Sequence, residues 1–287
     1  MVFVTYGSRN DVTQGYTYAP QTPLIKPIDI PIPEKAPYPE KISEELPPNL
    51  SSEGVVLLEP KSFKVLYAKN ENQRLYPASI TKLLTALTAL DFYNLDQVLS
   101  VPEVAYEGQI MGLVPGEKIK VRDLLYGLLI KSGNDAAMVL AGSDSVKYDL
   151  FVYAMNEKAL ALNMTNTHFN NPTGLDDDNH YSTPRDLAIL GAVVNNHPLL
   201  SEIVKIKNTV VTDVAKTHWH ELENVNILIG DSGINGMKTG YTPKANECLL
   251  SRASREGRTL IGVILDSQDR FGETKALLDW GYRVYSW

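Results

Sequence analysis

The periodicity of apolar residues predicts that the folded part of the chain begins near Ser51 with a pair of strands. Two short apolar runs, residues 54–58 and 64–68, flank the turn-forming segment 59–62. Apolar runs of this length around a short polar segment are typical of a β-hairpin. We therefore expect the first ordered element to be a hairpin.

Helical periodicity dominates the middle of the chain. Leucines at positions 83, 84, 87 and 90 form one stripe, which predicts a helix from about Ser79 to Tyr93. Four more helices are predicted at residues 121–130, 136–141, 150–162 and 184–195. The segment from about residue 90 to residue 200 is therefore expected to be an all-helical lobe.

Strand character returns after about Ile203. Residues 247–253 and 258–265 are predicted to pair as a second hairpin, and residues 273–285 to form a closing helix. Strands from both ends of the chain can share one antiparallel sheet, with the helical lobe inserted between them. This pattern predicts an α/β fold of two lobes, and a cleft between lobes is a natural ligand site.

Prolines are concentrated before the predicted domain. Nine of the 17 prolines lie between Ala19 and Leu50, in a stretch without helical or strand periodicity. This composition favours an extended, semi-rigid polyproline II segment. We expect residues 1–50 to be a largely irregular tether and residues 51–287 to be the folded domain. A strap lying on that domain is the alternative.

Composition excludes several classes of protein. The chain has 27 basic and 34 acidic residues, and it lacks a Lys/Arg-rich run, which argues against nucleic-acid binding. A single cysteine, Cys248, excludes an intrachain disulfide and a cysteine-based zinc or iron–sulfur site. No stretch reaches the roughly 18 consecutive apolar residues of a membrane helix. The apolar start, residues 1–4, is too short for a signal peptide.

The first candidate for chemistry is the pair Ser79 and Lys82, at the predicted start of the first helix. Residues three apart on a helix share a face, so the serine hydroxyl would lie beside the lysine amine. A lysine can activate a serine if burial or nearby positive charge lowers its pKa. The helix N-terminus also offers N–H groups to a developing oxyanion. An N-cap serine beside a surface lysine is the simpler alternative.

Two further motifs are individually weak. The tripeptide 132–134 (Ser-Gly-Asn) lies between two predicted helices, where its hydroxyl and amide could relay a proton and hold a substrate amide. The tripeptide 238–240 (Lys-Thr-Gly) precedes the C-terminal hairpin, where it could bind a carboxylate, the glycine admitting substrate to the backbone. An ordinary turn is the alternative for each tripeptide.

The order and context of these motifs resemble the serine penicillin-binding enzymes, and more narrowly the low-molecular-weight D-alanyl-D-alanine carboxypeptidases. The resemblance extends from about Ser51 to Trp287. It implies a DD-peptidase/β-lactamase-like fold of two lobes, in which an antiparallel sheet flanked by helices lies beside an all-helical lobe. The matching segments are residues 76–83 (YPASITKL), 125–137 (LYGLLIKSGNDAA), 168–175 (HFNNPTGL) and 236–242 (GMKTGYT).

The resemblance also implies a reaction. The substrates would be peptidoglycan stem peptides ending in D-Ala-D-Ala, and Ser79 would attack the penultimate D-Ala carbonyl while Lys82 accepts its proton. Ser132 would help pass a proton to the departing D-Ala amine, and Asn134 would hold a substrate amide. Lys238 would support the proton relay electrostatically.

Further residues follow from the same resemblance. Thr239 would bind the terminal carboxylate, together with Arg270 just before the last predicted helix. The backbone N–H groups of Ser79 and Tyr241 would form the oxyanion hole, and Gly240 would let substrate approach the strand. Water would release the shortened peptide without a metal or organic cofactor. β-Lactams, which mimic the dipeptide, would leave a long-lived acyl group on Ser79.

The implied substrate lies outside the cytoplasm, whereas the sequence shows no export signal. We therefore expect an extracytoplasmic protein, in the periplasm or on the outer face of the bacterial cytoplasmic membrane. A leader or anchor would have been trimmed, and residues 19–50 would act as the spacer. Contact with the membrane would need such an anchor.

Three alternatives stay open at this stage. The motifs do not separate a carboxypeptidase from a DD-endopeptidase of the same family. A class A β-lactamase would need a deacylating glutamate, and no Glu-x-x-x-Asn pattern occurs between Asn163 and Thr183. A catalytically silent cell-wall scaffold would be expected to lose the catalytic motifs, which are all present here.

Overall fold

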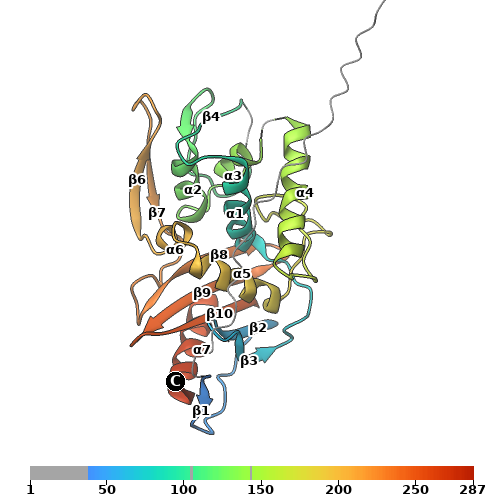
Figure 1. Ribbon diagram of the computed structural model, residues 1–287, viewed down its shortest axis with the longest axis vertical. Helices are drawn as coiled ribbons and strands as arrows, with labels where there is room; N and C mark the ends of the chain where they lie inside the picture. Colours follow the sequence, from blue (N-terminus) through green and yellow to red (C-terminus); the bar gives the residue numbers. More distant parts are fainter. Residues whose placement is uncertain (1–37, 104–105, 143) are drawn as a thin grey trace, which may run out of the picture.

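The computed structural model describes residues 38–103, 106–142 and 144–287, arranged around one antiparallel sheet (Figure 1). The sheet has five strands in the order β3-β2-β10-β9-β8. The two N-terminal strands thus pair directly with the C-terminal hairpin, as the sequence predicts. The strands are β2 (Gly54–Glu59), β3 (Lys64–Lys69), β8 (Ile234–Thr242), β9 (Asn246–Arg255) and β10 (Arg258–Ser267).

Both faces of the sheet are covered, and alternate residues of its central strands enter different cores. In β2, Val56 and Leu58 join the core shared with the helical lobe, whereas Val55 and Leu57 join a second core. This sorting follows from the two-residue period of a strand. The second core is covered by α7 (Arg270–Val284), which lies on the opposite side of the sheet from the helical lobe (Figure 1).

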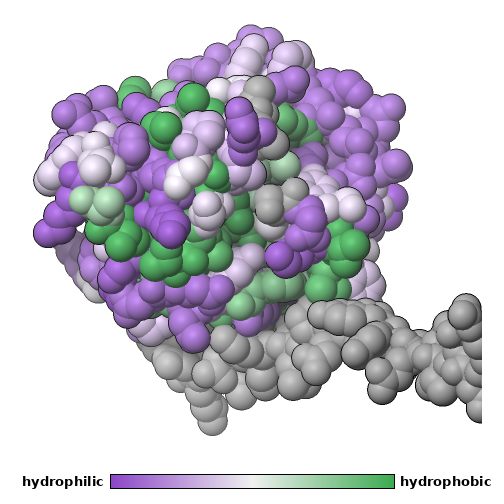
Figure 2. Space-filling view, turned by 90° about the horizontal axis from the view of Figure 1, so that it is seen from above, coloured by the Kyte–Doolittle hydropathy of each residue, from purple (hydrophilic) through white to green (hydrophobic). Residues whose placement is uncertain are grey.

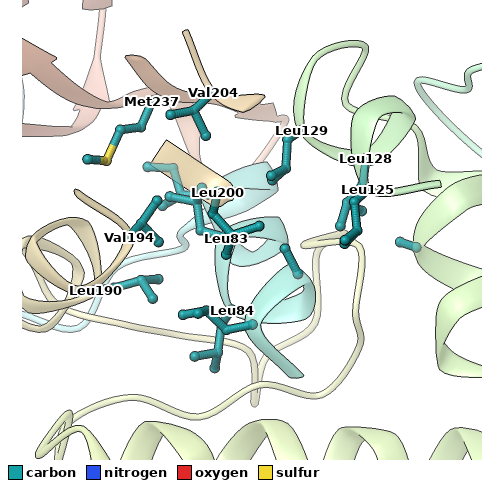
Figure 3. Close-up of a cluster of buried hydrophobic side chains, with 14 of the residues drawn as sticks. Leu83, Leu84, Leu125, Leu128, Leu129, Leu190, Val194, Leu200, Val204 and Met237 are labelled. Atoms are coloured by element: carbon teal, nitrogen blue, oxygen red, sulfur yellow. The ribbon is translucent and has the colours of Figure 1, made fainter. Parts of the chain in front are cut away.

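The helical lobe packs its leucine stripes against each other and against the sheet. Figure 3 shows Leu83 and Leu84 of α1 close to side chains of α2, α5 and α6. The predicted helices are all present, together with the unpredicted short helix α6. The helices are α1 (Lys82–Phe92), α2 (Val121–Leu129), α3 (Asn134–Ala141), α4 (Ser145–Ala161), α5 (Pro184–Asn196) and α6 (Leu200–Ile203).

Polar side chains define where the later helices begin. Thr183 accepts a hydrogen bond from the backbone N–H of Asp186, and Pro184 occupies the first turn of α5. Asp269 caps α7 in the same way, through the N–H of Gly272. The cap at Asp269 starts α7 at Arg270, three residues before the predicted start.

Two small hairpins at the outer end of the helical lobe are not predicted from the sequence: β4 (Val98–Ser100) with β5 (Lys118–Lys120), and β6 (Asn208–Thr212) with β7 (Trp219–Glu223). Between β4 and β5, Met111 and Leu113 are buried in the main core, whereas Ile110 and Val114 are exposed. Seen from this end, apolar surface gathers across the middle of the molecule, with hydrophilic surface around it (Figure 2).

Residues 38–50 lie on the domain as a strap. The strand β1 (Glu40–Lys41) pairs with β11 (Tyr285–Ser286), and the Glu45 carbonyl accepts a hydrogen bond from the Trp280 indole at 3.1 Å. Lys64 also donates to the Pro39 carbonyl at 2.6 Å. For these residues the tether expectation is therefore replaced by the strap alternative. The rest of the expected tether, residues 1–37, lies outside the described residues.

Candidate active site

Ser79 lies beside Lys82, as their spacing predicts, although the local structure differs from the prediction. Ser79 is in a 3₁₀ turn, Ala78–Thr81, and the α-helix begins only at Lys82. The Lys82 Nζ atom lies 2.8 Å from the Ser79 Oγ atom. It also donates to the Thr173 carbonyl at 2.5 Å, and the Lys82 side chain is fully buried. A buried amine is thus placed where it can take the serine proton.

The surroundings of Lys82 favour its neutral form. Burial lowers the pKa of Lys82 well below its ordinary value, and the positive charge of Lys238 lowers it further. The carboxylate of Asp135 acts in the opposite direction. Burial, with the charge of Arg270, also lowers the pKa of Lys238 to about 7. The site therefore holds an amine that can accept a proton near neutral pH.

Ser132 and Asn134 lie in and directly after the turn between α2 and α3. Ser132 is buried and has a φ of +64°, a region that a serine rarely adopts. The Asn134 amide donates to the Glu107 carbonyl at 2.6 Å, and its backbone N–H donates to the Gln109 carbonyl at 2.7 Å. These contacts fix the orientation of the Asn134 side chain.

Strand β8 forms the opposite wall of the site. Lys238 and Thr239 are buried, whereas Tyr241 is exposed. A Cβ atom added to Gly240 would lie 2.8 Å from the Ala78 Cβ and 3.1 Å from the Ser79 backbone nitrogen. Glycine is therefore needed at this position for the strand to approach the turn that carries Ser79.

Arg270 reaches the same strand from the start of α7. Its Nη1 atom donates to the Gly240 carbonyl at 2.8 Å. Its Nε atom is buried and has no hydrogen-bond partner among the described residues. The guanidinium thus offers a further donor beside Thr239 and Gly240.

A family model of D-alanyl-D-alanine carboxypeptidases matches residues 41–269. The chain belongs to this family. It is 33% identical to the carboxypeptidase DacF of Bacillus subtilis over 246 residues, which are 82% of this chain and 63% of the relative. It is also 33% identical to DacA of Escherichia coli K12 over 257 residues, which are 83% of this chain and 62% of the relative. The chain thus spans less than two thirds of the length of either carboxypeptidase.

Solved structures of the family confirm the expected fold. The Streptomyces K15 DD-transpeptidase is similar with a TM-score of 0.78 and 32% identity, covering 83% of this chain and all of that structure. A D-alanyl-D-alanine carboxypeptidase from Mycobacterium tuberculosis is similar with a TM-score of 0.77 and 29% identity, covering 85% of this chain and 96% of that structure. The family resemblance and the two-lobed fold class are therefore confirmed.

Asp135, next to Asn134, is a further buried residue beside the candidate site, and the sequence motifs do not predict its role. Its side chain is buried, and its carboxylate accepts the backbone N–H groups of Met111, Gly112 and Leu113 at 2.9, 2.9 and 3.0 Å. It thereby ties the loop before β5 to the turn that carries Asn134. The available sequence signal is an acidic residue directly before the helix predicted at residues 136–141.

The loop 170–175 is the second missed part of the carboxypeptidase-family site. Asn171 Oδ1 accepts hydrogen bonds from the Thr173 N–H, the Thr173 hydroxyl and the Gly174 N–H, at 3.1, 2.8 and 2.7 Å. These bonds hold the Thr173 carbonyl against Lys82. Gly174 has a φ of +85°, and a Cβ atom there would lie only 2.0 Å from the Ala78 carbonyl oxygen. This segment carries part of the family resemblance, but its sequence alone predicts no role for it.

Metal-ligating residues do not gather at the site. Across the residues that the structure describes, no group of three or more His, Cys, Asp or Glu side chains could hold a metal ion. The set of groups tied to Ser79 consists of the buried amine of Lys82 beside it and the amine of Lys238, whose charge acts on Lys82. Such a set is suited to nucleophilic attack assisted by a base.

Proposed function

We propose that the protein is a serine-type D-Ala-D-Ala carboxypeptidase acting on peptidoglycan stem peptides through an acyl-enzyme on Ser79. The observation that carries this proposal is the 2.8 Å contact between Ser79 Oγ and the buried Lys82 Nζ. The family membership and the names of the relatives supply the substrate.

Acylation would begin with attack of Ser79 Oγ on the penultimate D-Ala carbonyl, while Lys82 takes the hydroxyl proton. The backbone N–H groups of Ser79 and Tyr241 would stabilise the oxyanion. The close approach of Gly240 to Ser79 supports this pairing of N–H groups. Cleavage of the C–N bond then needs a proton on the departing amine, which Ser132 would relay from Lys82 with the support of the Lys238 charge.

Substrate binding would use the remaining groups. Thr239 and Arg270 would bind the terminal carboxylate, and the unpaired, buried Nε atom of Arg270 supports this assignment. Asn134 would hold the amide on the acyl side of the scissile bond. After the terminal D-Ala leaves, water would attack the ester and restore Ser79.

The name of one similar solved structure supports a second reaction of the same acyl-enzyme. The Streptomyces K15 structure is titled a DD-transpeptidase and is 32% identical to this chain. The acyl group would then pass to an amine instead of water. Comparing the products formed with and without an added D-amino acid distinguishes hydrolysis from transfer of the acyl group.

We propose an extracytoplasmic location for this activity, because its substrate is a cell-wall peptide. Within the described part of the chain, no helix is both long enough and apolar enough to cross a membrane. Fractionation of cells that produce the native gene, with detection of the protein by antibody, tests the location.

Intact-mass spectrometry with benzylpenicillin tests the acyl-enzyme. We expect an adduct of one drug molecule that persists for many minutes and is absent from Ser79→Ala, together with release of D-Ala from a stem peptide. The variant removes only the hydroxyl, so its melting temperature serves as the folding control. Rapid loss of the adduct with consumption of the drug would indicate a β-lactamase. No adduct on the folded wild-type protein would refute the mechanism.

The pH dependence of acylation provides a second test, with opposite shifts for two variants. Acylation needs neutral Lys82, so its rate should rise with pH through the Lys82 pKa. Lys238→Gln removes a charge that lowers this pKa, so the acid limb should move to higher pH. Asp135→Asn removes a charge that raises it, so the limb should move to lower pH.

The pH at which the acylation rate rises distinguishes an electrostatic effect on the Lys82 pKa from structural damage to the site. A purely structural loss would lower the whole rate profile of a variant without moving its acid limb. Measuring the benzylpenicillin acylation rate from about pH 5 to pH 10 covers the ordinary range of a perturbed lysine. Shifts in the same direction for both variants would contradict the electrostatic assignment.

A further inference from the structure

His180 is a buried histidine to which the proposed reaction gives no part. It is only 1% exposed, and its ring packs edge-on against Phe169 with the ring centroids 5.4 Å apart. Its Nδ1 atom lies 3.1 Å from the backbone nitrogen of Asn170, and its Nε2 atom lies 2.8 Å from the Thr81 Oγ1 atom. Each ring nitrogen therefore has a hydrogen-bond partner, and the two partners come from different parts of the chain.

The two partners fix the tautomer of His180. A backbone N–H can only donate, so the Nδ1 atom accepts the hydrogen bond from Asn170 and carries no proton. The neutral ring then carries its proton on Nε2 and donates it to the Thr81 hydroxyl oxygen. Burial lowers the pKa of His180 to about 4, although the carboxylate of Asp177 acts in the opposite direction. The ring is therefore neutral near neutral pH.

The hydrogen bonds of His180 join the segment that carries the nucleophile to the segment that holds its base. Thr81 is the last residue of the 3₁₀ turn that contains Ser79. The N–H bound by Nδ1 begins the loop 170–175, which supplies the carbonyl that accepts from Lys82 Nζ at 2.5 Å. The imidazole thus bridges the turn and the loop.

A second hydrogen bond joins α1 to the same loop. The Thr85 hydroxyl donates to the Pro172 carbonyl at 2.7 Å, one helical turn after Thr81. Lys82 lies between these two connections in the sequence, so the position of its amine depends on both of them. Small displacements of catalytic groups slow a reaction strongly, and a shift of about 1 Å can cost 10²-fold.

We propose that His180 is a positioning residue for acylation, which holds the turn of Ser79 at a fixed distance from the loop that orients Lys82. The inference rests on the proposed carboxypeptidase function and adds to it a residue outside the reacting groups. His180 would act through Thr81 and the loop 170–175. Its loss should therefore slow acylation of the bound ligand without weakening the binding step.

Two substitutions separate the two hydrogen bonds of His180. The amide nitrogen of glutamine lies close to the place of histidine Nε2, so His180→Gln keeps a donor for Thr81. Asparagine is shorter, so His180→Asn keeps an acceptor for the Asn170 N–H but loses the bond to Thr81. The rate of adduct formation at increasing benzylpenicillin concentration, followed by intact mass, gives the acylation rate constant and the half-saturating concentration separately.

We expect the acylation rate constant of His180→Asn to fall by about 10- to 100-fold at an unchanged half-saturating concentration. His180→Gln should stay within about threefold of the wild type, because it keeps the bond to Thr81. Loosening the loop would also admit water to Lys82 and raise its pKa, so the acid limb of acylation by His180→Asn should move to higher pH.

Thr81→Val removes the same hydrogen bond from its other end, with a side chain of similar shape, and should reproduce the loss in His180→Asn. The double variant should be no slower than either single variant, because both substitutions remove one interaction. His168→Asn is the matched control. His168 is a partly exposed histidine whose Nδ1 atom donates to the Asn179 carbonyl, and its replacement should leave the acylation rate unchanged.

Acylation rate constants of both His180→Asn and Thr81→Val within threefold of the wild type would overturn this inference alone. Equal losses in His180→Asn and His180→Gln, or a loss that appears only as a higher half-saturating concentration, would also overturn it. If His180→Asn does not fold, Thr81→Val decides the question by the same measurement. Wild-type protein that forms no adduct would refute the proposed function and the inference with it.

Discussion

Replacing Lys82 with methionine is expected to slow acylation of Ser79 by about 10²- to 10⁴-fold, the usual contribution of a general base. Lys82 Nζ is 2.8 Å from Ser79 Oγ, and methionine removes the amine while it fills most of the buried volume. The second-order rate of benzylpenicillin adduct formation, followed by intact mass, measures this loss.

The fold should tolerate this replacement. Burial already disfavours the charged form of Lys82, so an apolar side chain of similar length does not leave an unpaired charge in the core. Thermal unfolding of Lys82→Met is therefore the folding control. An acylation rate within tenfold of the wild-type rate would show that another group takes the serine proton.

Replacing Lys158 with methionine is expected to have the opposite profile, a large loss of stability with little change in acylation. Lys158 Nζ lies 2.6 Å from Asp91 Oδ2, and the two side chains are only 2% and 8% exposed. Methionine would leave the Asp91 carboxylate buried and unpaired, which costs about 3–5 kcal/mol. Urea denaturation monitored by circular dichroism measures the change in the free energy of unfolding.

A double variant checks the cause of this loss. Replacing both partners, Lys158→Met with Asp91→Leu, removes the unpaired charge and should recover most of the lost stability. The acylation rate of the folded single variant should match that of the wild type, because the Asp91–Lys158 pair joins α1 to α4 outside the site. A single variant within about 1 kcal/mol of wild-type stability would show that the pair contributes little.

Most of the fold can be predicted because its elements are long and periodic. The helices of the lobe and the two hairpins of the main sheet have apolar runs that match one period. The β6–β7 hairpin has no such apolar run, since only Val211, His220 and Leu222 of its ten residues are buried. The strap is only the alternative at the level of sequence, because β1 pairs with β11 at the other end of the chain and the local composition carries no sign of that contact.

The site is predicted where the chemistry depends on short spacing, and missed where it depends on tertiary contacts. Ser79 and Lys82 are three residues apart, so helical geometry alone brings them together. Thr173 reaches Lys82 from 91 residues away, and Asp135 holds N–H groups more than 20 residues earlier. Burial, which sets the pKa of Lys82, also comes from these distant segments.

The packing of Gly174 and Gly240 against the turn at Ala78 has a consequence for how activity arises during folding. The turn belongs to the first third of the chain, Gly174 to the middle, and Gly240 to a strand anchored by the C-terminal hairpin. The reactive serine is therefore completed only by contacts of long sequence separation, which form slowly. If penicillin acylates Ser79 as proposed, the fraction of protein that forms the adduct during refolding would report the molecules in which the N-terminal strands have already joined the C-terminal hairpin in one sheet.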